Sequence, residues 1–145
     1  MLEQLNRRFV WAALGCFFAI AVTRQLRLFL LATFEPRSHV LLDSLPSLLG
    51  AVGVTFALQA TTRGITRLNV LSATFIAAVL SLGYELAQSI LPLSTWRTFD
   101  WNDIWATIAG LLIGGVTSWL IRGSAVAARG SARTTAAPSI ASPEG

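Results

Sequence analysis

The sequence has few charged residues for its length. Aspartate, glutamate and arginine together make up 12% of the 145 residues, and lysine is absent. A soluble domain carries about 25% charged residues, so too few charges are present here to cover a soluble surface. Hydrophobic residues make up 54% of the chain, and the mean hydropathy is +0.63. We therefore expect a membrane protein.

Cysteine and histidine are also scarce. Cys16 is the only cysteine, so the chain cannot form an internal disulfide. His39 is the only histidine, and although Asp43 follows one turn later, no HExxH or other ligand cluster is present. The sequence also lacks a glycine-rich phosphate loop and a nucleophile elbow. We expect no metal site and no cofactor, and the sequence favours a protein without enzymatic activity over an enzyme.

Four apolar segments predict an all-α polytopic membrane domain within residues 1–121. A membrane-spanning helix needs about 20 predominantly apolar residues. The expected spans are about 9–31, 44–60, 70–91 and 103–121. Residues 122–145, rich in Ala, Ser, Gly and Arg, are expected to form a disordered cytoplasmic tail.

The first apolar segment is interrupted by Arg24 and Arg27. Because a span must run past Val22 to reach sufficient length, both arginines would lie near its outer end, either snorkelling or paired. Alternatively, residues 28–34 form a separate interfacial turn. A third interpretation is a signal peptide cleaved after the A-x-A sequence at 19–21.

The second span can begin in two places. Asp43 or Ser44 can cap a helix that has Pro46 in its first turn, or the helix can begin nearer His39.

The arginines predict the orientation. Four spans place seven arginines on one side and four on the other: Arg7, Arg8, Arg63, Arg67, Arg122, Arg129 and Arg133 against Arg24, Arg27, Arg37 and Arg97. The positive-inside rule then puts both termini in the cytoplasm of a bacterial inner membrane. Because the arginines lie at segment ends rather than in one patch, nucleic acid is not an expected partner; the lipid bilayer is.

Polar residues recur on one face of each of the last two spans. Ser81, Glu85 and Gln88 are spaced i, i+4, i+7 in the third. In the fourth, one face carries Asp103, Thr107, Gly110, Gly114 and Thr117. A carboxylate in a spanning helix costs about 2.5–3.5 kcal/mol on insertion scales, which favours a functional role for Glu85.

The short connection at 92–101 predicts that these two spans are antiparallel neighbours whose polar faces meet. Arg97, Asp100 and Asp103 would then cap an outward-facing cleft, and Asp103 could alternatively serve as a helix N-cap. Gly110 and Gly114 form a GxxxG pair that allows another helix backbone to approach closely.

This ordered set resembles the VanZ-like family of small bacterial membrane proteins. Glu85 and Gln88 match its E-x-x-Q, Arg97 and Asp100 match its loop pair, and Asp103 and Gly110 match its D-x-x-x-N-x-x-G, in which Thr107 replaces the Asn. The match covers about residues 81–115. The resemblance implies a four-helix membrane protein and a link to resistance to the glycopeptide teicoplanin or to the cell envelope, without an established reaction.

Three functions remain open at this stage. The cleft could bind an envelope lipid, a glycan or a glycopeptide without turnover, with Glu85 at its centre. The chain could instead be a structural or assembly subunit of an envelope or polysaccharide system that binds a membrane partner through Gly110 and Gly114. It could also be a membrane enzyme that uses Glu85 as acid or base on a lipid-linked substrate.

Overall fold

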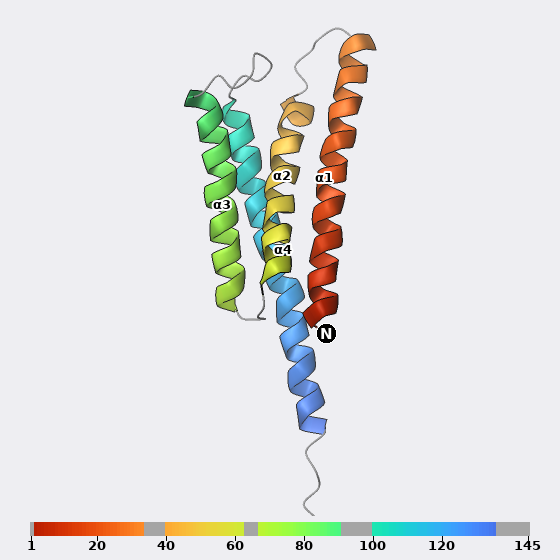
Figure 1. Cartoon of the computed structure of the whole chain (residues 1–145), viewed down its shortest axis with the longest axis vertical. Helices are drawn as coiled ribbons and strands as arrows, with labels where there is room; N and C mark the ends of the chain where they lie inside the picture. Colours follow the sequence, from red (N-terminus) through yellow and green to blue (C-terminus); the bar gives the residue numbers. More distant parts are fainter. Residues whose placement is uncertain (1, 34–39, 63–66, 91–99, 136–145) are drawn as a thin grey trace, which may run out of the picture.

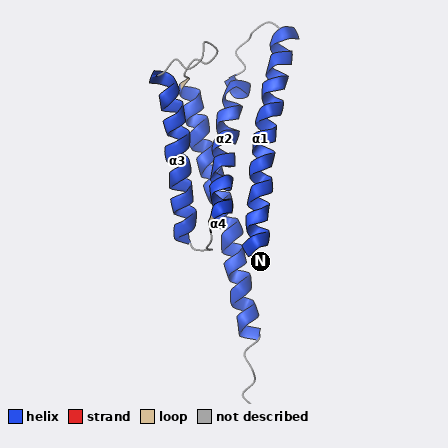
Figure 2. Cartoon of the chain, in the orientation of Figure 1, coloured by secondary structure: helices blue, strands red, loops and turns tan. Residues whose placement is uncertain are grey.

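The described residues form a bundle of four α-helices. The computed structural model describes residues 2–33, 40–62, 67–90 and 100–135, and the regular elements in these ranges are all helical (Figures 1 and 2). The helices are α1 (Leu2–Thr33), α2 (Val40–Thr61), α3 (Arg67–Ile90) and α4 (Trp101–Thr135). The prediction of an all-α chain with four long apolar helices is confirmed.

Each helix is long and apolar enough to cross a membrane. The candidate spans are Glu3–Phe29, Asp43–Thr61, Asn69–Ala87 and Trp101–Ala127. Large apolar side chains remain exposed on the outside of the bundle, among them Trp11, Phe18, Phe75 and Leu120. A soluble protein rarely exposes so continuous an apolar surface, so the helices fit a multi-pass membrane protein.

α2 is the central helix of the bundle. It packs against α1, α3 and α4, and α3 also packs against α4, whereas the backbones of α1 and α3 are not neighbours in the described ranges. Figure 1 shows α2 between α1 and α3, with α4 behind. The helices alternate in direction, so α1 and α3 end where α2 and α4 begin. We call this the Glu85 end and the opposite end the Arg122 end.

The glycine pair of α4 packs against α2. A Cβ atom at Gly110 would overlap the carbonyl oxygen of Leu48, and one at Gly114 would lie 2.9 Å from the Cβ of Thr55. Both glycines are buried. The face that carries Gly110 and Gly114 was expected to meet the third span or a partner protein. α2 covers this face instead, because the α2 backbone at Leu48 and the small side chains of Ala51 and Thr55 allow a close approach.

One helix start follows the alternative prediction and one helix end differs from the predicted one. α2 begins at Val40, as the alternative start near His39 predicted, so Pro46 lies inside the helix rather than in its first turn. α4 continues to Thr135, so a disordered tail is not confirmed for residues 122–135; residues 136–145 lie outside the described ranges. Alanine and arginine are strong helix formers, and this composition extends the helix past the apolar segment.

α1 is continuous through residues 28–33, so the separate interfacial turn is excluded. Arg24 and Arg27 therefore both lie within the helix. Arg27 is paired: its Nε lies 2.9 Å from Oδ1 of Asp43 on α2, and both side chains are about half exposed. This ion pair joins α1 to α2 at the Glu85 end.

Candidate functional site

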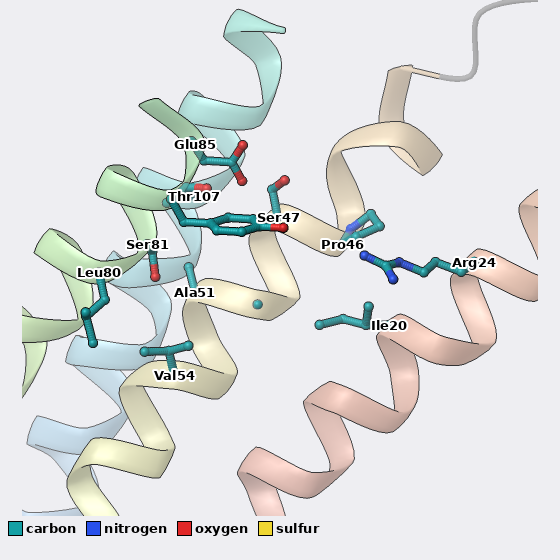
Figure 3. A pocket seen from close by; sticks show the side chains of 12 residues that line it. Ile20, Arg24, Pro46, Ser47, Ala51, Val54, Leu80, Ser81, Glu85 and Thr107 are labelled. Atoms are coloured by element: carbon teal, nitrogen blue, oxygen red, sulfur yellow. The ribbon is translucent and has the colours of Figure 1, made fainter. Parts of the chain in front are cut away.

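A cavity of about 280 Å³ lies at the Glu85 end, lined mainly by α1, α2 and α3 (Figure 3). Half of its lining residues carry polar side chains: Arg24, Ser47, Ser81, Tyr84, Glu85 and Thr107. The others are small or apolar: Ile20, Pro46, Gly50, Ala51, Val54 and Leu80. We call this cavity the Glu85 pocket. It combines both charge signs with several hydroxyl groups at one place in a predominantly apolar bundle.

Glu85 is the buried acid of the pocket. Its side chain is 6% exposed, and Thr107 of α4 beside it is 1% exposed. Figure 3 shows the carboxyl group of Glu85 directed toward Ser47 of α2, with Thr107 next to it. Ser81 lies one turn before Glu85 on the same face of α3 and also lines the pocket. Ser47 of α2 and Thr107 of α4 thus lie beside the carboxyl group.

Arg24 brings a positive charge to the pocket from the opposite wall. Its side chain extends from α1 toward Pro46 of α2 (Figure 3). Arg24 makes no hydrogen bond or ion pair with another residue of the described ranges, in contrast to Arg27 three residues later. The pocket therefore has an acidic wall on α3 and a basic wall on α1, with α2 between them.

The pocket contains only part of the predicted site. Glu85 and Thr107 lie together in it, as does Ser81. Asp100 and Asp103 are not among its lining residues. Arg97 lies outside the described residues, and Gln88 is described only as part of the backbone of α3.

Asp100, rather than Asp103, is the N-cap of α4. The backbone N–H of Asn102 donates to Oδ1 of Asp100 over 3.1 Å, and the side-chain amide of Asn102 donates to Oδ2 over 3.0 Å. These two hydrogen bonds, the backbone one first, lower the pKa of the Asp100 carboxyl group below its ordinary value. Asp103 lies in the first turn of the helix, where an acid also complements the helix dipole.

A second polar cluster lies at the Arg122 end. Arg122 was expected to begin a disordered tail, but it lies in α4 with 2% of its side chain exposed. Its Nη2 donates to the backbone carbonyl of Gln59 over 2.7 Å and to the hydroxyl group of Thr62. The guanidinium carbon also lies 5.4 Å from the ring centre of Phe9 on α1. Arg122 thus ties the end of α2 to α1 and α4.

Gln59 extends this cluster to the remaining helix. Its Nε2 donates to the backbone carbonyl of Val70 on α3 over 3.2 Å. The buried polar pairs Thr55–Gln59 on α2 and Ser118–Arg122 on α4 are each spaced i, i+4. That spacing was the available sequence signal for the cluster, and it was missed because Gln59 and Arg122 were assigned to segment ends.

No family model, no curated protein and no solved structure matches this chain. The resemblance to the VanZ-like family therefore rests on the ordered residues around Glu85 and stays a prediction. In the described ranges, no three His, Cys, Asp or Glu side chains lie close enough together to hold a metal ion. The chemistry of the site is accordingly argued from Glu85, Arg24 and the hydroxyl groups.

Proposed function

We propose that the chain is a bacterial inner-membrane protein that binds a polar group of an envelope component in the Glu85 pocket, without chemical turnover. The observation that carries this proposal is the burial of Glu85 beside a cavity that also contains Arg24 and several hydroxyl groups. A carboxylate in a spanning helix is costly and often marks a ligand pathway or site.

The second polar cluster supports this assignment by contrast. Arg122 donates to a carbonyl and a hydroxyl group and lies over an aromatic ring, so protein groups surround a polar side chain that holds helices together. Glu85 is also buried, with 6% exposed against 2% for Arg122, and it borders a cavity of about 280 Å³. Space beside a buried charge is what a binding site requires and a helix clamp does not.

The size of the pocket favours a small polar group. Pockets that enclose drug-sized ligands have volumes of roughly 300–1,000 Å³, and this cavity of about 280 Å³ lies just below that range. It fits the head group of a lipid or a single sugar better than a whole glycopeptide such as teicoplanin. A role in glycopeptide resistance would then operate through the envelope component and not through enclosure of the drug.

The positive-inside rule supports the location and orientation in this proposal. The arginine-rich end that includes Arg7, Arg8 and Arg122 would face the cytoplasm, and the Glu85 end would face outward. The assembly-subunit alternative loses its predicted interface, because α2 covers Gly110 and Gly114. The enzyme alternative stays a prediction.

Thermal unfolding of the delipidated protein in detergent tests the proposal. The probes are the polar lipids extracted from the expressing cells and, separately, teicoplanin. At least one probe should raise the unfolding temperature of the wild type, since a ligand that binds the folded state stabilises it. Glu85→Gln should abolish this shift, and Arg27→Gln, which breaks the neighbouring ion pair outside the pocket, should retain it. The proposal is wrong if neither probe stabilises the wild type or if Glu85→Gln responds as the wild type does.

A further inference from the structure

One face of α1 changes from basic to aromatic to apolar at the Arg122 end. Four exposed residues with the spacing i, i+4, i+7 and i+11 share this side of the helix: Arg7, Trp11, Leu14 and Phe18. Phe9, which is buried against α2, lies on the opposite side. Trp11 is 67% exposed and Phe18 is 72% exposed. We call the side that carries these four residues the outer face of α1, and Figure 1 shows α1 at the edge of the bundle.

Gly15 forms a notch beside the outer face. It lies one turn after Trp11 and one turn before Phe18, and it is exposed. A Cβ atom built on Gly15 would meet nothing within 4 Å, so the space beside its backbone is open. Arg8 lies two turns before Gly15 on the same flank of the helix. The notch is thus bordered by two large aromatic side chains and lies two turns from a cation.

The start of α1 is strongly basic. Arg7 and Arg8 are both exposed, and neither makes a hydrogen bond or ion pair with another residue of the described ranges. Glu3 is the only acid in α1. The other acids of the described ranges lie at the Glu85 end: Asp43, Glu85, Asp100 and Asp103. The Arg122 end therefore presents a net positive charge to its surroundings.

The length of this surface matches one leaflet of a bilayer. From Arg8 to Phe18 the helix rises about 15 Å, and half of the hydrocarbon core of a bilayer is also about 15 Å thick. α1 contains the candidate span Glu3–Phe29. Trp11 lies between the arginines and the apolar residues, and tryptophan is enriched at this boundary in membrane proteins. A lipid lying along α1 would therefore have its phosphate at the arginines and its acyl chain at Gly15 and Phe18.

We propose that the outer face of α1 binds a phospholipid with a net negative head group at the Arg122 end. Arg7 and Arg8 contact the phosphate, and one acyl chain lies in the notch at Gly15, between Trp11 and Phe18. Charge complementarity selects this class, because arginines near a membrane surface attract anionic lipids. A zwitterionic head group would bring its own cation toward the two arginines. The site shares no residue with the Glu85 pocket, so the inference is independent of the proposed function.

A second copy of the chain is the other occupant that the notch could admit. Gly15 and Ala19 form a small-xxx-small pair of the kind that allows two helices to approach closely in a membrane. All copies in one membrane share the same orientation, so a symmetric pair of α1 helices would place the Arg7 and Arg8 side chains of both copies side by side. Like charges repel one another, whereas an anionic lipid neutralises them. The arginines therefore favour the lipid.

Native mass spectrometry of the full chain in detergent tests the lipid class. Phosphatidylglycerol and phosphatidylethanolamine with the same acyl chains are added at equal concentrations. We expect the wild type to bind phosphatidylglycerol about tenfold more tightly, because two arginines attract its net charge. The double change Arg7→Gln and Arg8→Gln should remove this preference. Arg27→Gln, which removes a positive charge at the Glu85 end, should retain it. Equal binding of the two lipids to the wild type, or a preference that survives the double change, overturns the inference.

Gly15→Leu tests the notch. The leucine side chain should weaken the binding of phosphatidylglycerol about threefold, because the acyl chain loses its contacts there. Gly83→Leu is the matched control at an exposed position of α3, where a Cβ atom also meets nothing within 4 Å, and it should leave the binding unchanged. Unchanged binding to Gly15→Leu overturns the proposed site. The same spectra report dimers, and a wild-type dimer that is lost in Gly15→Leu would assign the notch to a second copy and overturn the lipid.

Salt gives a measurement that needs no variant. Raising the ammonium acetate concentration from about 0.1 M to about 1 M shortens the Debye length from about 10 Å to about 3 Å. The preference for phosphatidylglycerol should then fall, and a preference that does not change with salt overturns the inference. This measurement decides the inference if the double arginine variant fails to fold.

The two binding proposals can be separated in one background. The lipid extract of the unfolding experiment also contains any anionic lipids of the cell, so the Glu85-dependent shift is measured in the Arg7→Gln and Arg8→Gln variant. A shift there that Glu85→Gln abolishes supports the Glu85 pocket, whatever the outcome for α1. The absence of such a shift, together with a preference for phosphatidylglycerol that requires the two arginines, contradicts the Glu85 pocket and supports the site on α1.

Discussion

The guanidinium group of Arg122 donates to the backbone carbonyl of Gln59 over 2.7 Å, with 2% of the arginine side chain exposed. Gln59 is in the last turn of α2, whose final carbonyl groups have no partner within the helix. A cation at this position also complements the negative end of the helix dipole. Arg122 therefore serves as a C-cap for α2 that is supplied from α4.

Arg122→Met should destabilise the bundle and retain most of its packing. The change removes the charged donor of the Gln59 carbonyl, which keeps its hydrogen bonds from the backbone N–H and the hydroxyl group of Thr62. A hydrogen bond to a charged group contributes about 1.5–3 kcal/mol. We expect the free energy of unfolding to fall by about 2 kcal/mol, measured by denaturation in detergent micelles and followed by circular dichroism. Arg8→Met, at an exposed position on α1, is the control and should change it by less than about 0.5 kcal/mol. Equal losses in the two variants would show that the cap contributes nothing.

Gly110→Ala should separate α2 from α4. The added methyl group would overlap the Leu48 carbonyl oxygen, which cannot move without the helix backbone. Overpacking of this kind costs roughly 1–3 kcal/mol. Gly123→Ala is the matched control on the same helix, because a Cβ there meets nothing within 4 Å. It should be neutral or stabilising by up to about 1 kcal/mol. If Gly110→Ala were as stable as Gly123→Ala, the close packing of α2 and α4 would be wrong.

The Asp100 cap should make the stability of α4 depend on pH. Hydrogen bonds from Asn102 lower the pKa of this carboxyl group in the folded state. Its contribution is therefore complete above the unfolded pKa of about 4 and is lost as the pH falls through the lower folded pKa. Asp100→Asn keeps a capping side chain that does not titrate. We expect the wild type to lose more helicity than Asp100→Asn between about pH 5 and pH 2, measured by circular dichroism. Identical pH profiles would contradict the capping role.

The orientation can be tested with a single introduced thiol. Cys16 is the only native cysteine, so Cys16→Ala gives a chain without thiols, and Asn102→Cys then adds one at the exposed start of α4. A membrane-impermeant maleimide applied to intact spheroplasts should label this residue. Arg8→Cys in the same background should react only after the membrane is permeabilised. The reverse pattern would invert the proposed topology.

Hydropathy predicted the four helices because a bilayer requires long apolar segments, and the helical period placed Ser81 and Glu85 on one face. The neighbour of Gly110 could not be predicted in the same way. A GxxxG pair shows that a helix can approach closely, but the sequence of α4 alone does not say which helix approaches. That choice depends on the backbone and the small residues that α2 offers at Leu48, Ala51 and Thr55.

The role of Arg122 could not be predicted from hydropathy, which treats an arginine as a mark of the membrane boundary and so placed Arg122 at the start of a tail. Its partners Gln59 and Thr62 lie at the end of α2, far back along the chain. The i, i+4 pairs Thr55–Gln59 and Ser118–Arg122 indicate a polar face on each helix, but they do not say that the two faces meet. Arg24 lies near the outer end of the first candidate span, as expected, but the sequence did not indicate that it lines a pocket together with Glu85.

α1 is attached to the bundle mainly through apolar packing on α2. Phe9 of α1 shares a buried cluster with Val52 and Phe56 of α2, and a Cβ atom at Gly53 would lie 3.2 Å from the Cβ of Cys16. At the Glu85 end, the polar tie between the two helices in the described ranges is the half-exposed Arg27–Asp43 pair, a type of interaction worth about 0–1 kcal/mol. The distance between Arg24 and the wall that carries Glu85 is therefore set by the α1–α2 interface, far from the pocket itself.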